Sequence, residues 1–565
     1  MARLEELGEV VTTDLLIIGG GISGLTAAIS SMEESPEIDI LLVDKQTIGW
    51  SGKAPKTGGV LMVIGPEEDL EDFLEYQISN IGDYLNDQDL LYALAKESYG
   101  LVEKLDTWGI KVARDAEGKL QTTRGFCPKW SIVGIDLNIL VPLRKKARKM
   151  GAKTFNKVQV VDLLTQNGRV VGAVGFNIID GRFYIFKAKS TILANGSCNY
   201  KVERMWSAAN GDGIAAAYRA GAEMRNAEFG NFYDILIKDQ DSPAVGSQAF
   251  IHNAKGERLV TLYGAEDEPD IALATILGME KEISEGRGPL VLDIAGWQGR
   301  FASRPRLKRP HWDAFYGRSI EKMTKYGPPP TDKPEVTFSF HAELSPVKVD
   351  HNMKTTLQGL WAIGDTSYGG SALAGAVFAP PARMRGTGLL NAVFSAMRGG
   401  PSAARSIPEA SPPHVDYDET KRLKDEIFTP MGRDNGLTPA DVVQAIQEIV
   451  VPIKYNLRRS KDRLEEALSK LEALKQKLPT LFAKDGHALF QCHEAKAMAL
   501  CAEMTYRAAL MREESRGWHY REDYPKRDDK NWLKWIIVKQ EGDKMVLSTE
   551  PVPVDKYRIK PQSLS

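Results

Sequence analysis

A glycine-rich turn between two short apolar segments is the feature that most limits what this chain can fold into. Residues 14–18 read as a buried strand, residues 22–34 as a helix that begins at the glycines, and "IDILLVDK" (38–45) as a second buried strand. Gly19, Gly21 and Gly24 supply a G-x-G-x-x-G pattern in the turn. This order of elements predicts a Rossmann-like unit that binds a dinucleotide.

Each part of this pattern has a physical role. The first glycine permits the tight turn, the second lets a pyrophosphate approach the backbone, and the third lets helix and strand pack closely. The N-terminus of the helix offers free N–H groups and a partial positive charge to the phosphates. Asp44 follows about 20 residues after Gly24, where a carboxylate accepts from a ribose hydroxyl. The pattern alone does not separate NAD from FAD.

Composition excludes several classes of protein. With 565 residues, the chain should form two or three packed units, and 43% apolar with 26% charged residues is ordinary for a globular protein. A net charge of −2 gives no electrostatic reason to expect nucleic acid or an anionic membrane as a partner. No apolar run of about 18 residues is present, so no membrane span is expected. The N-terminal residues do not resemble a signal peptide.

The four cysteines are Cys127, Cys198, Cys492 and Cys501, and no two are spaced as C-x-x-C. This spacing predicts neither an iron–sulfur cluster nor a structural metal in this chain. Scattered thiols favour a reducing compartment over a disulfide framework, which indicates a cytoplasmic protein.

Composition and hydrophobic periodicity change several times along the rest of the chain. Residues 157–196 alternate short strands with turns and predict a β-meander. Residues 229–340 are rich in proline and poor in periodicity, which indicates an inserted domain. Residues 453–478 and 493–515 carry apolar residues at helical spacing and predict two long antiparallel helices packed on the body of the protein.

Several motifs together carry a family resemblance that spans nearly the whole chain. They are "GGGISG", "SGKAPKTGG", "ILANGS", "NGDGIAAAYRAGAEMRNAEF", "GLWAIGDTS", "GTGLLNA" and "REESRGWHYREDYPKRDDKNWLKW". With these, the chain resembles the flavoprotein subunits of the fumarate reductase and succinate dehydrogenase family. The same superfamily includes L-aspartate oxidase and the alpha subunit of adenylylsulfate reductase.

The resemblance implies an α/β fold with three parts. These are an FAD-binding Rossmann-like domain with a mixed sheet, an inserted α+β capping domain, and a C-terminal helical domain. The implied boundaries are 1–228 and 341–405 for the FAD-binding domain, 229–340 for the capping domain, 406–430 for a linker, 431–530 for the helical domain and 531–565 for a C-terminal segment.

FAD is the cofactor that the resemblance implies, because the loop "GWSGKAPKTGG" (49–59) matches the family loop that wraps the flavin. Small residues are needed where the backbone touches the ring system. Ser51, Thr57, Gly58 and Gly59 would contact FAD there. The full set of implied FAD-binding residues is Gly19, Gly21, Ser23, Gly24, Asp44, Lys45, Ser51, Gly52, Thr57, Gly58, Gly59, Val158, Ala194, Gly196, Asp212, Asp365, Leu389 and Leu390.

Particular roles follow from the family for some of these residues. Backbone groups near Val158 would hold the adenine, and Asp365 would hold the ribityl chain. Asp212 belongs to the family's "GDG" turn, and an N-cap of the following helix is its alternative or additional role. Gly52 stands where membrane-bound members carry the histidine that bonds covalently to the flavin, so FAD should be noncovalent.

The substrate site departs from the dicarboxylate-reducing members. Tyr233, in "EFGNFYD", replaces their substrate histidine, and Leu277 replaces the arginine that delivers a proton to carbon. "PAVGSQAFIHN" replaces their loop containing glutamate and arginine. These changes argue against plain fumarate or succinate as the substrate.

Two candidate substrate residues remain by resemblance. His341 matches the family histidine that binds a substrate carboxylate. Arg383 matches the substrate arginine, with Arg385 as a close rival, and an arginine fork clamps a carboxylate, sulfate or phosphate through two bonds. The alternative for His341 and Arg383 is a structural role, and for Tyr233 a packed aromatic. His519 and Arg521 could pass for an acid–base pair, but the family places that segment in a structural seam.

The predicted function is a soluble FAD oxidoreductase. It would exchange electrons between an anionic small molecule and a separate iron–sulfur or ferredoxin-like protein. An electron-transfer flavoprotein subunit without its own substrate chemistry, or an oxidase like L-aspartate oxidase, is the alternative. An NAD-only Rossmann dehydrogenase explains neither Asp365 nor the loop at 49–59.

Overall fold

A mixed seven-stranded sheet organises the N-terminal part of the protein. The structure, a computed structural model, describes residues 3–54, 60–124, 129, 131–136, 138–202, 209–238, 242–243, 247–263, 273–296, 333–367 and 387–564. The sheet has the strand order β6-β2-β1-β9-β8-β7, with β16 paired to β9. Its strands are β1 (Glu9–Ile18), β2 (Ile40–Asp44), β6 (Lys153–Asn156), β7 (Val158–Gln166), β8 (Arg169–Asn177), β9 (Phe183–Leu193) and β16 (Leu360–Ala362).

The sheet combines parallel and antiparallel strands. β1, β2, β6, β9 and β16 run parallel to their neighbours, whereas β7, β8 and β9 form the antiparallel meander. All five residues of β2 are buried, as expected of a parallel strand covered on both faces. The predicted β-meander of residues 157–196 is therefore confirmed.

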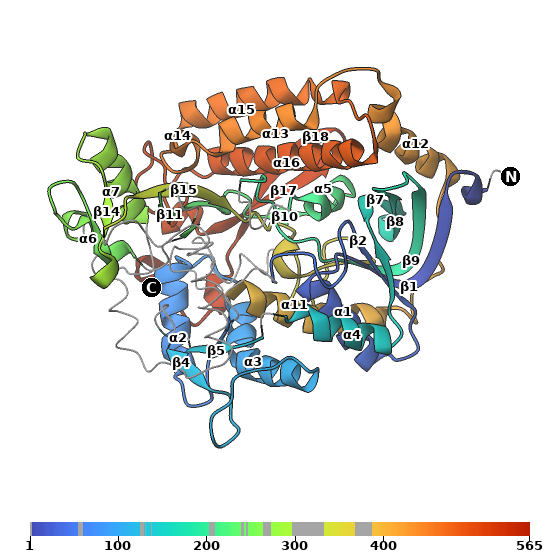
Figure 1. Cartoon of the computed structure of the whole chain (residues 1–565), viewed down its shortest axis with the longest axis horizontal. Coiled ribbons are helices and arrows are strands. Elements are labelled where there is room, and N and C mark those ends of the chain that lie inside the picture. The colour runs from blue at the N-terminus through green and yellow to red at the C-terminus, as the bar shows by residue number, and fades with distance from the viewer. Residues whose placement is uncertain are drawn as a thin grey trace.

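Three helices gather on one side of this sheet in Figure 1. They are α1 (Ile22–Glu34), α4 (Leu140–Lys149) and α11 (Thr387–Ser406). Small residues bring α1 and α11 close, because a Cβ on Gly400 would lie 2.5 Å from Ser30 Oγ and 2.7 Å from the Ala27 oxygen. This packing of α11 against α1 holds α1 and the glycine turn before it in place.

Smaller sheets and helices surround this body. One sheet joins β3 (Val60–Val63), β5 (Ser131–Gly134) and β4 (Thr122–Arg124) beside α2 (Leu70–Tyr76), the π-helix Gln77–Ile81 and α3 (Gln88–Thr107). Another joins β12 (Ser242–Pro243), β11 (Asn231–Ile237) and β15 (Val336–Ala342). Near it lie α6 (Leu259–Leu262), α7 (Leu273–Ser284) and the pair β13 (Ile251–His252) and β14 (Val291–Leu292).

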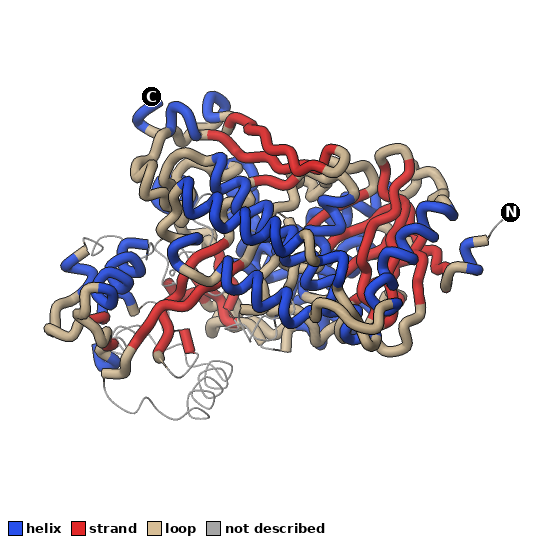
Figure 2. Tube along the Cα trace, turned by 90° about the horizontal axis from the view of Figure 1, so that it is seen from above, coloured by secondary structure: helices blue, strands red, loops and turns tan. Residues whose placement is uncertain are grey.

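The C-terminal part is mainly helical. α13 (Pro439–Val450), α15 (Lys461–Lys475) and α16 (Gly486–Met511) pack side by side (Figure 1, Figure 2). α5 (Asp212–Arg219) lies between α16 and β7, so the helical layer rests on the FAD-binding part. β10 (Met224–Arg225), β17 (Lys534–Glu541) and β18 (Lys544–Pro551) form a three-stranded sheet, and α17 (Asp529–Trp532) precedes it.

The predicted helix 453–478 is broken in the structure. α14 (Ile453–Asn456) ends before Leu457, and α15 begins after Ser460, whose side chain caps it. The intervening backbone pairs with a distant segment instead, because Arg459 N donates to the Tyr520 oxygen at 3.2 Å. The predicted linker 406–430 also contains a helix, α12 (Tyr417–Phe428), with Asp416 as its N-cap.

The predicted α/β class with a C-terminal helical domain is confirmed. Within the described parts of the chain, no helix combines the length and the apolar character needed to cross a bilayer.

Candidate functional site

The glycine turn after β1 is built so tightly that only glycine fits at two of its positions. Gly19 has φ of +116°, and a Cβ there would lie 2.2 Å from the Ala194 backbone oxygen. A Cβ on Gly24 would lie 1.9 Å from the Gly19 oxygen. The turn therefore brings the start of α1 directly against the ends of β1 and β9.

The backbone in front of this turn leaves room that suits a pyrophosphate. Apart from its own helix and chain neighbours, the described residues bring only the Ser51 oxygen within 4.0 Å of a Cβ on Gly21. A Cβ on Gly52 would lie 3.7 Å from the Cα of Gly21. Gly21 is the N-cap of α1 and has no side chain to cap it, so the first N–H groups of the helix can bind phosphate oxygens. These residues fit the FAD that the sequence predicts.

Asp44 ties the turn to the flavin loop. One oxygen, Oδ2, accepts from Gly20 N at 2.5 Å and from Ser51 Oγ at 2.9 Å, and Oδ1 accepts from Gln46 N at 2.5 Å. The carboxylate is buried at the end of β2. It fixes the two backbone segments between which the dinucleotide is expected.

Other predicted FAD-binding residues gather at the same edge of the sheet. Ala194 N donates to the Ile18 oxygen at 2.7 Å, and Gly196 N donates to Thr366 Oγ1 at 2.8 Å. Asp365 lies beside Thr366 in the 3-10 helix Gly364–Thr366. A Cβ on Gly364 would approach Ser23 Oγ to 2.2 Å, so this helix lies against α1.

Three further predicted residues lie in regular elements. Leu389 and Leu390 occupy the first turn of α11, where backbone N–H groups lack partners within the helix. Val158 begins β7, and the preceding Lys157 donates its N–H to the Gln46 oxygen at 3.0 Å. This bond holds the proposed adenine segment next to the end of β2. Thr57, Gly58 and Gly59 lie outside the described residues.

Lys45 and Asp212 belong to a buried charge cluster that reaches the helical domain. Lys45 Nζ pairs with Asp212 Oδ2 and lies 2.7 Å from Glu494 Oε1 in α16. Glu494 also pairs with Lys201 Nζ at 2.6 Å and accepts from Asn210 Nδ2 at 2.8 Å. Burial opposes the charge on Lys45, but the two carboxylates outweigh it and raise the pKa of Lys45. Glu494 was not foreseen, because nothing local marks one acid among the many helical ones.

His341 lies on β15 beside the flavin loop. Its ring packs on Phe232 with centroids 4.3 Å apart, and its Nε2 lies 3.7 Å from Glu343 Oε1. Glu343 Oε1 in turn lies 2.8 Å from the Nζ of Lys53, the residue that follows Gly52 in the flavin loop. Neither Lys53 nor Glu343 was predicted as a site residue from the sequence, although Lys53 is a charged residue in a loop rich in small ones.

Tyr233 points away from His341. In the register of β11 with β15, Phe232 lies opposite His341, and Tyr233 lies opposite Phe340 on the other face. The Tyr233 hydroxyl donates to the Val451 oxygen at 2.9 Å, and burial raises the pKa of this phenol well above its usual value. The structure therefore places Tyr233 among packed aromatics, which corrects its assignment as a substrate residue.

Of the other residues discussed for the substrate site, the structure describes Leu277 but not the two arginines. Arg383 and Arg385 lie outside the described residues. Leu277 lies in α7, partly buried against the core.

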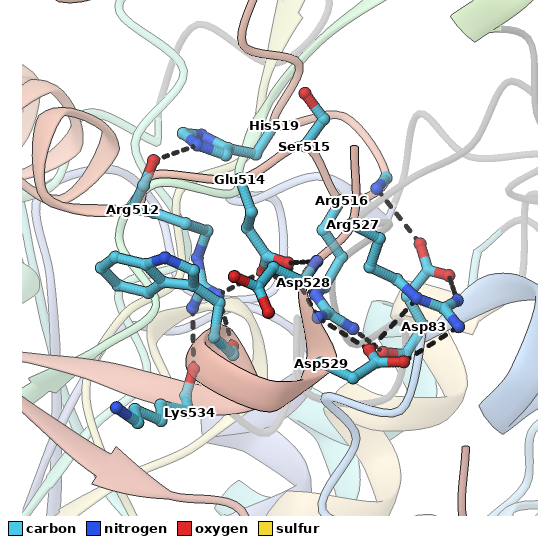
Figure 3. A network of polar contacts seen from close by, with 12 residues as sticks. Asp83, Arg512, Glu514, Ser515, Arg516, His519, Arg527, Asp528, Asp529 and Lys534 are labelled. Atoms are coloured by element: carbon cyan, nitrogen blue, oxygen red, sulfur yellow. Dashed lines mark hydrogen bonds and ion pairs between the residues drawn. The ribbon is translucent and has the colours of Figure 1, made fainter. Parts of the chain in front are cut away.

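A buried ionic network joins the C-terminal segment to the rest of the protein (Figure 3). Arg512 Nε lies 2.8 Å from Glu228 Oε1, and its Nη1 lies 2.8 Å from Glu514 Oε1. Arg516 pairs with the same Glu514 at 2.7 Å and with Asp529 at 3.0 Å. Because buried charges must be paired and hydrogen-bonded, this network has a structural role.

His519 is held neutral within this seam. Its Nε2–H donates to the Arg512 oxygen at 3.1 Å, and its Nδ1 accepts from Arg459 Nη1 at 2.6 Å. An arginine can only donate and a carbonyl can only accept, so these partners fix the tautomer. Burial, followed by the charges of Arg459 and Arg512, lowers the pKa of His519 well below its usual value. His519 and Arg521 are fully surrounded by protein.

One group of possible metal ligands occurs in the described part of the chain. Ligand atoms of Asp87, Asp89 and His351 lie within 4.8 Å of one another. Asp87 caps α3 and lies 3.1 Å from His351 Nε2, so a cap and an ion pair account for the arrangement.

Comparison with known proteins identifies an FAD-binding domain. The sequence matches the FAD binding domain family over residues 14–377 and the fumarate reductase flavoprotein C-terminal family over residues 447–565. Similar curated proteins include a subunit of the fumarate reductase (CoM/CoB) of Methanothermobacter marburgensis, 27% identical over 94% of this chain and 97% of that protein. L-aspartate oxidase of Streptomyces coelicolor is 27% identical over 95% of this chain and 93% of that protein.

Solved structures share the fold. Adenylylsulfate reductase from Archaeoglobus fulgidus has a TM-score of 0.79 at 21% identity, covering 98% of this chain and 97% of that chain. E. coli quinol fumarate reductase has a TM-score of 0.82 at 20% identity, covering 98% of this chain and 99% of that chain.

Proposed function

The chain belongs to the fumarate reductase and succinate dehydrogenase flavoprotein family and is an FAD-dependent oxidoreductase; we propose that it exchanges electrons between an anionic small molecule and an iron–sulfur or ferredoxin-like protein. FAD would supply the two-electron chemistry when bound. The residues of the chain would bind the substrate, hold it before the cofactor and exclude water.

The observation that carries this proposal is the position of His341. Its side chain is buried and shares the partner Glu343 with Lys53, which belongs to the loop expected to wrap the flavin. Glu343 and Asp365 already pair with the ammonium group of Lys53, so His341 is the group of this cluster that is proposed to bind the anion. Arg383 is proposed as the fork that clamps the same anion.

A separate electron carrier follows from the cysteines. No C-x-x-C pair occurs in the sequence, so this chain offers no ordinary set of cluster ligands. Several relatives are named as subunits, among them the Wolinella succinogenes flavoprotein subunit of 8-methylmenaquinol:fumarate reductase. A reducing, cytoplasmic setting remains part of the proposal.

The identity of the anion is the point on which two observations differ. The names of the relatives favour fumarate, whereas Leu277 at the place of the proton-delivering arginine argues against plain fumarate or succinate. We favour a different carboxylate or a sulfur oxyanion. A fumarate-reducing enzyme is the second candidate, and a flavoprotein subunit without its own substrate chemistry is the third.

The experiment is an anion titration of the purified holoprotein. Fumarate, sulfite and adenylylsulfate are added separately while the flavin difference spectrum is recorded. At least one anion other than fumarate should perturb the spectrum, and His341→Gln should weaken that binding without loss of FAD. Arg383→Ala should act likewise, and Arg383→Lys should rescue poorly because lysine lacks the fork.

Two results would contradict parts of this proposal. Fumarate turnover of about 1 to 1000 per second with a reduced dye would overturn the substrate assignment. A flavin spectrum that no anion perturbs would favour the subunit without substrate chemistry.

A further inference from the structure

Lys53 is a largely enclosed cation in the loop that is predicted to wrap the flavin. Its Nζ lies 2.8 Å from Glu343 Oε1, 2.9 Å from Ser197 Oγ and 3.6 Å from Asp365 Oδ2. The side chains of Lys53, Glu343 and Asp365 are only 16%, 7% and 17% exposed. An ammonium group in such a setting requires partners, because water cannot solvate it fully.

The partners of Lys53 come from segments that the FAD site already uses. Ser197 follows Gly196 at the end of β9, and Asp365 lies in the 3-10 helix that contacts α1. Glu343 follows β15, where it lies next to His341. Lys53 therefore bridges the cofactor side of the site and the proposed substrate side.

Lys53 offsets negative charge on both sides of the site. Glu343 and Asp365 are two carboxylates, and the ammonium group of Lys53 lies within ion-pair distance of both. Two-electron reduction adds negative charge to a flavin ring. A cation near the ring stabilises the reduced flavin, whereas carboxylates near the ring destabilise it. Both electrostatic effects are strong where water is excluded.

We propose that Lys53 sets the reduction potential of the bound flavin, with Glu343 as the carboxylate that moderates it. Lys53 raises the potential by offsetting the two acids. Glu343 lowers it and holds the ammonium group between the flavin loop and β15. The inference rests on FAD binding in the proposed site but on neither the substrate nor the electron partner.

The test is the midpoint potential of the flavin in purified holoprotein, measured by dye-linked titration without substrate. Lys53→Met should lower the ratio of reduced to oxidised flavin at a fixed potential by tenfold or more, which is about 30 mV for a two-electron couple. Glu343→Gln should shift the potential in the opposite direction. Lys53→Arg keeps the charge and should stay close to the wild-type value.

The controls separate this inference from loss of structure. FAD content and the unfolding midpoint are measured for each variant, and a general weakening of the site would move Lys53→Met and Lys53→Arg together. If Lys53→Met loses FAD, the midpoint potential of Glu343→Gln tests the proposal instead. An unchanged potential in Glu343→Gln, or equal shifts in the two lysine variants, overturns the role of Lys53. A wild-type chain that binds no FAD overturns the proposed function as well.

Discussion

Gly52 is a single residue on which the mode of cofactor attachment depends. Its φ of +76° lies in the left-handed region that favours glycine, and the family resemblance places it at the position of the histidine that binds flavin covalently. We therefore expect acid precipitation of the holoprotein to release yellow FAD into the supernatant. Colour that stays in the washed, denatured pellet would show a covalent bond and contradict the prediction.

His493 predicts a dependence of stability on pH. Its Nε2–H donates to the Ile427 oxygen at 3.1 Å, and burial lowers its pKa from 6.5 to about 3. Below about pH 6.5 the unfolded chain binds a proton that the folded chain excludes. As the pH falls below about 6.5, this residue should therefore lower the free energy of unfolding by about 1.4 kcal/mol per pH unit. Above about pH 6.5 its contribution to stability is fully present.

Urea unfolding at about pH 7 and about pH 5 measures this contribution. His493→Gln should be less stable than wild type at the higher pH, and the difference should shrink at the lower pH. His351 provides a contrast, since its bond to Asp87 raises the pKa of this imidazole. Its stabilisation is present at low pH and disappears as the pH rises, so His351→Gln should lose more stability at about pH 5. Parallel curves for His493→Gln and wild type would contradict the assignment.

At the scale of elements, the pairing of β11 with β15 decides which side chains can meet a substrate. Tyr233→Phe removes a buried hydroxyl that donates to Val451. We expect a loss of about 1 kcal/mol in the free energy of unfolding, with FAD content and anion-induced flavin spectra unchanged. Tyr506→Phe is a matched control, because it also removes a buried tyrosine hydroxyl that donates to a backbone oxygen, that of Ile449 at 3.0 Å. Loss of anion binding in Tyr233→Phe, with normal stability, would restore Tyr233 to the substrate site.

The same elements show how far the sequence could predict this protein. β1, α1 and β2 were predictable because apolar runs, glycine spacing and a terminal acid are all local signals. The face of Tyr233 was not, since the register of β11 depends on a strand about a hundred residues away in the chain. The break after Asn456 has a similar cause, because the backbone of Arg459 pairs with residues near the C-terminus.

At the scale of the whole molecule, Glu494 joins the helical domain to the cofactor site. Glu494→Gln leaves the ammonium groups of Lys45 and Lys201 in a buried site with less compensation. We expect the free energy of unfolding to fall by about 3–5 kcal/mol and the dissociation constant for FAD to rise. Urea unfolding and flavin titration measure both effects.

Glu466 supplies the matched control for this prediction. It also pairs with two lysines, Lys454 and Lys470, but at the surface of the helical domain. Glu466 also accepts from the Tyr455 hydroxyl at 2.6 Å, but because its ion pairs are exposed, Glu466→Gln should cost much less stability than Glu494→Gln. Equal losses in the two variants would show that Glu494 is no more than another surface partner.

The seam of Figure 3 places the partners of early charges late in the chain, and this has a consequence for synthesis on the ribosome. The carboxylate of Asp83 is separated from its partner Arg527 by 444 residues, and in the cluster near the cofactor site Lys45 is separated from Glu494 by 449. At about 5–20 residues per second, the first partner emerges on the order of 20 to 90 s before the second. We therefore expect these side chains to stay hydrated during that interval, and the contacts between the helical domain and the cofactor site to form only after α16 has been synthesised.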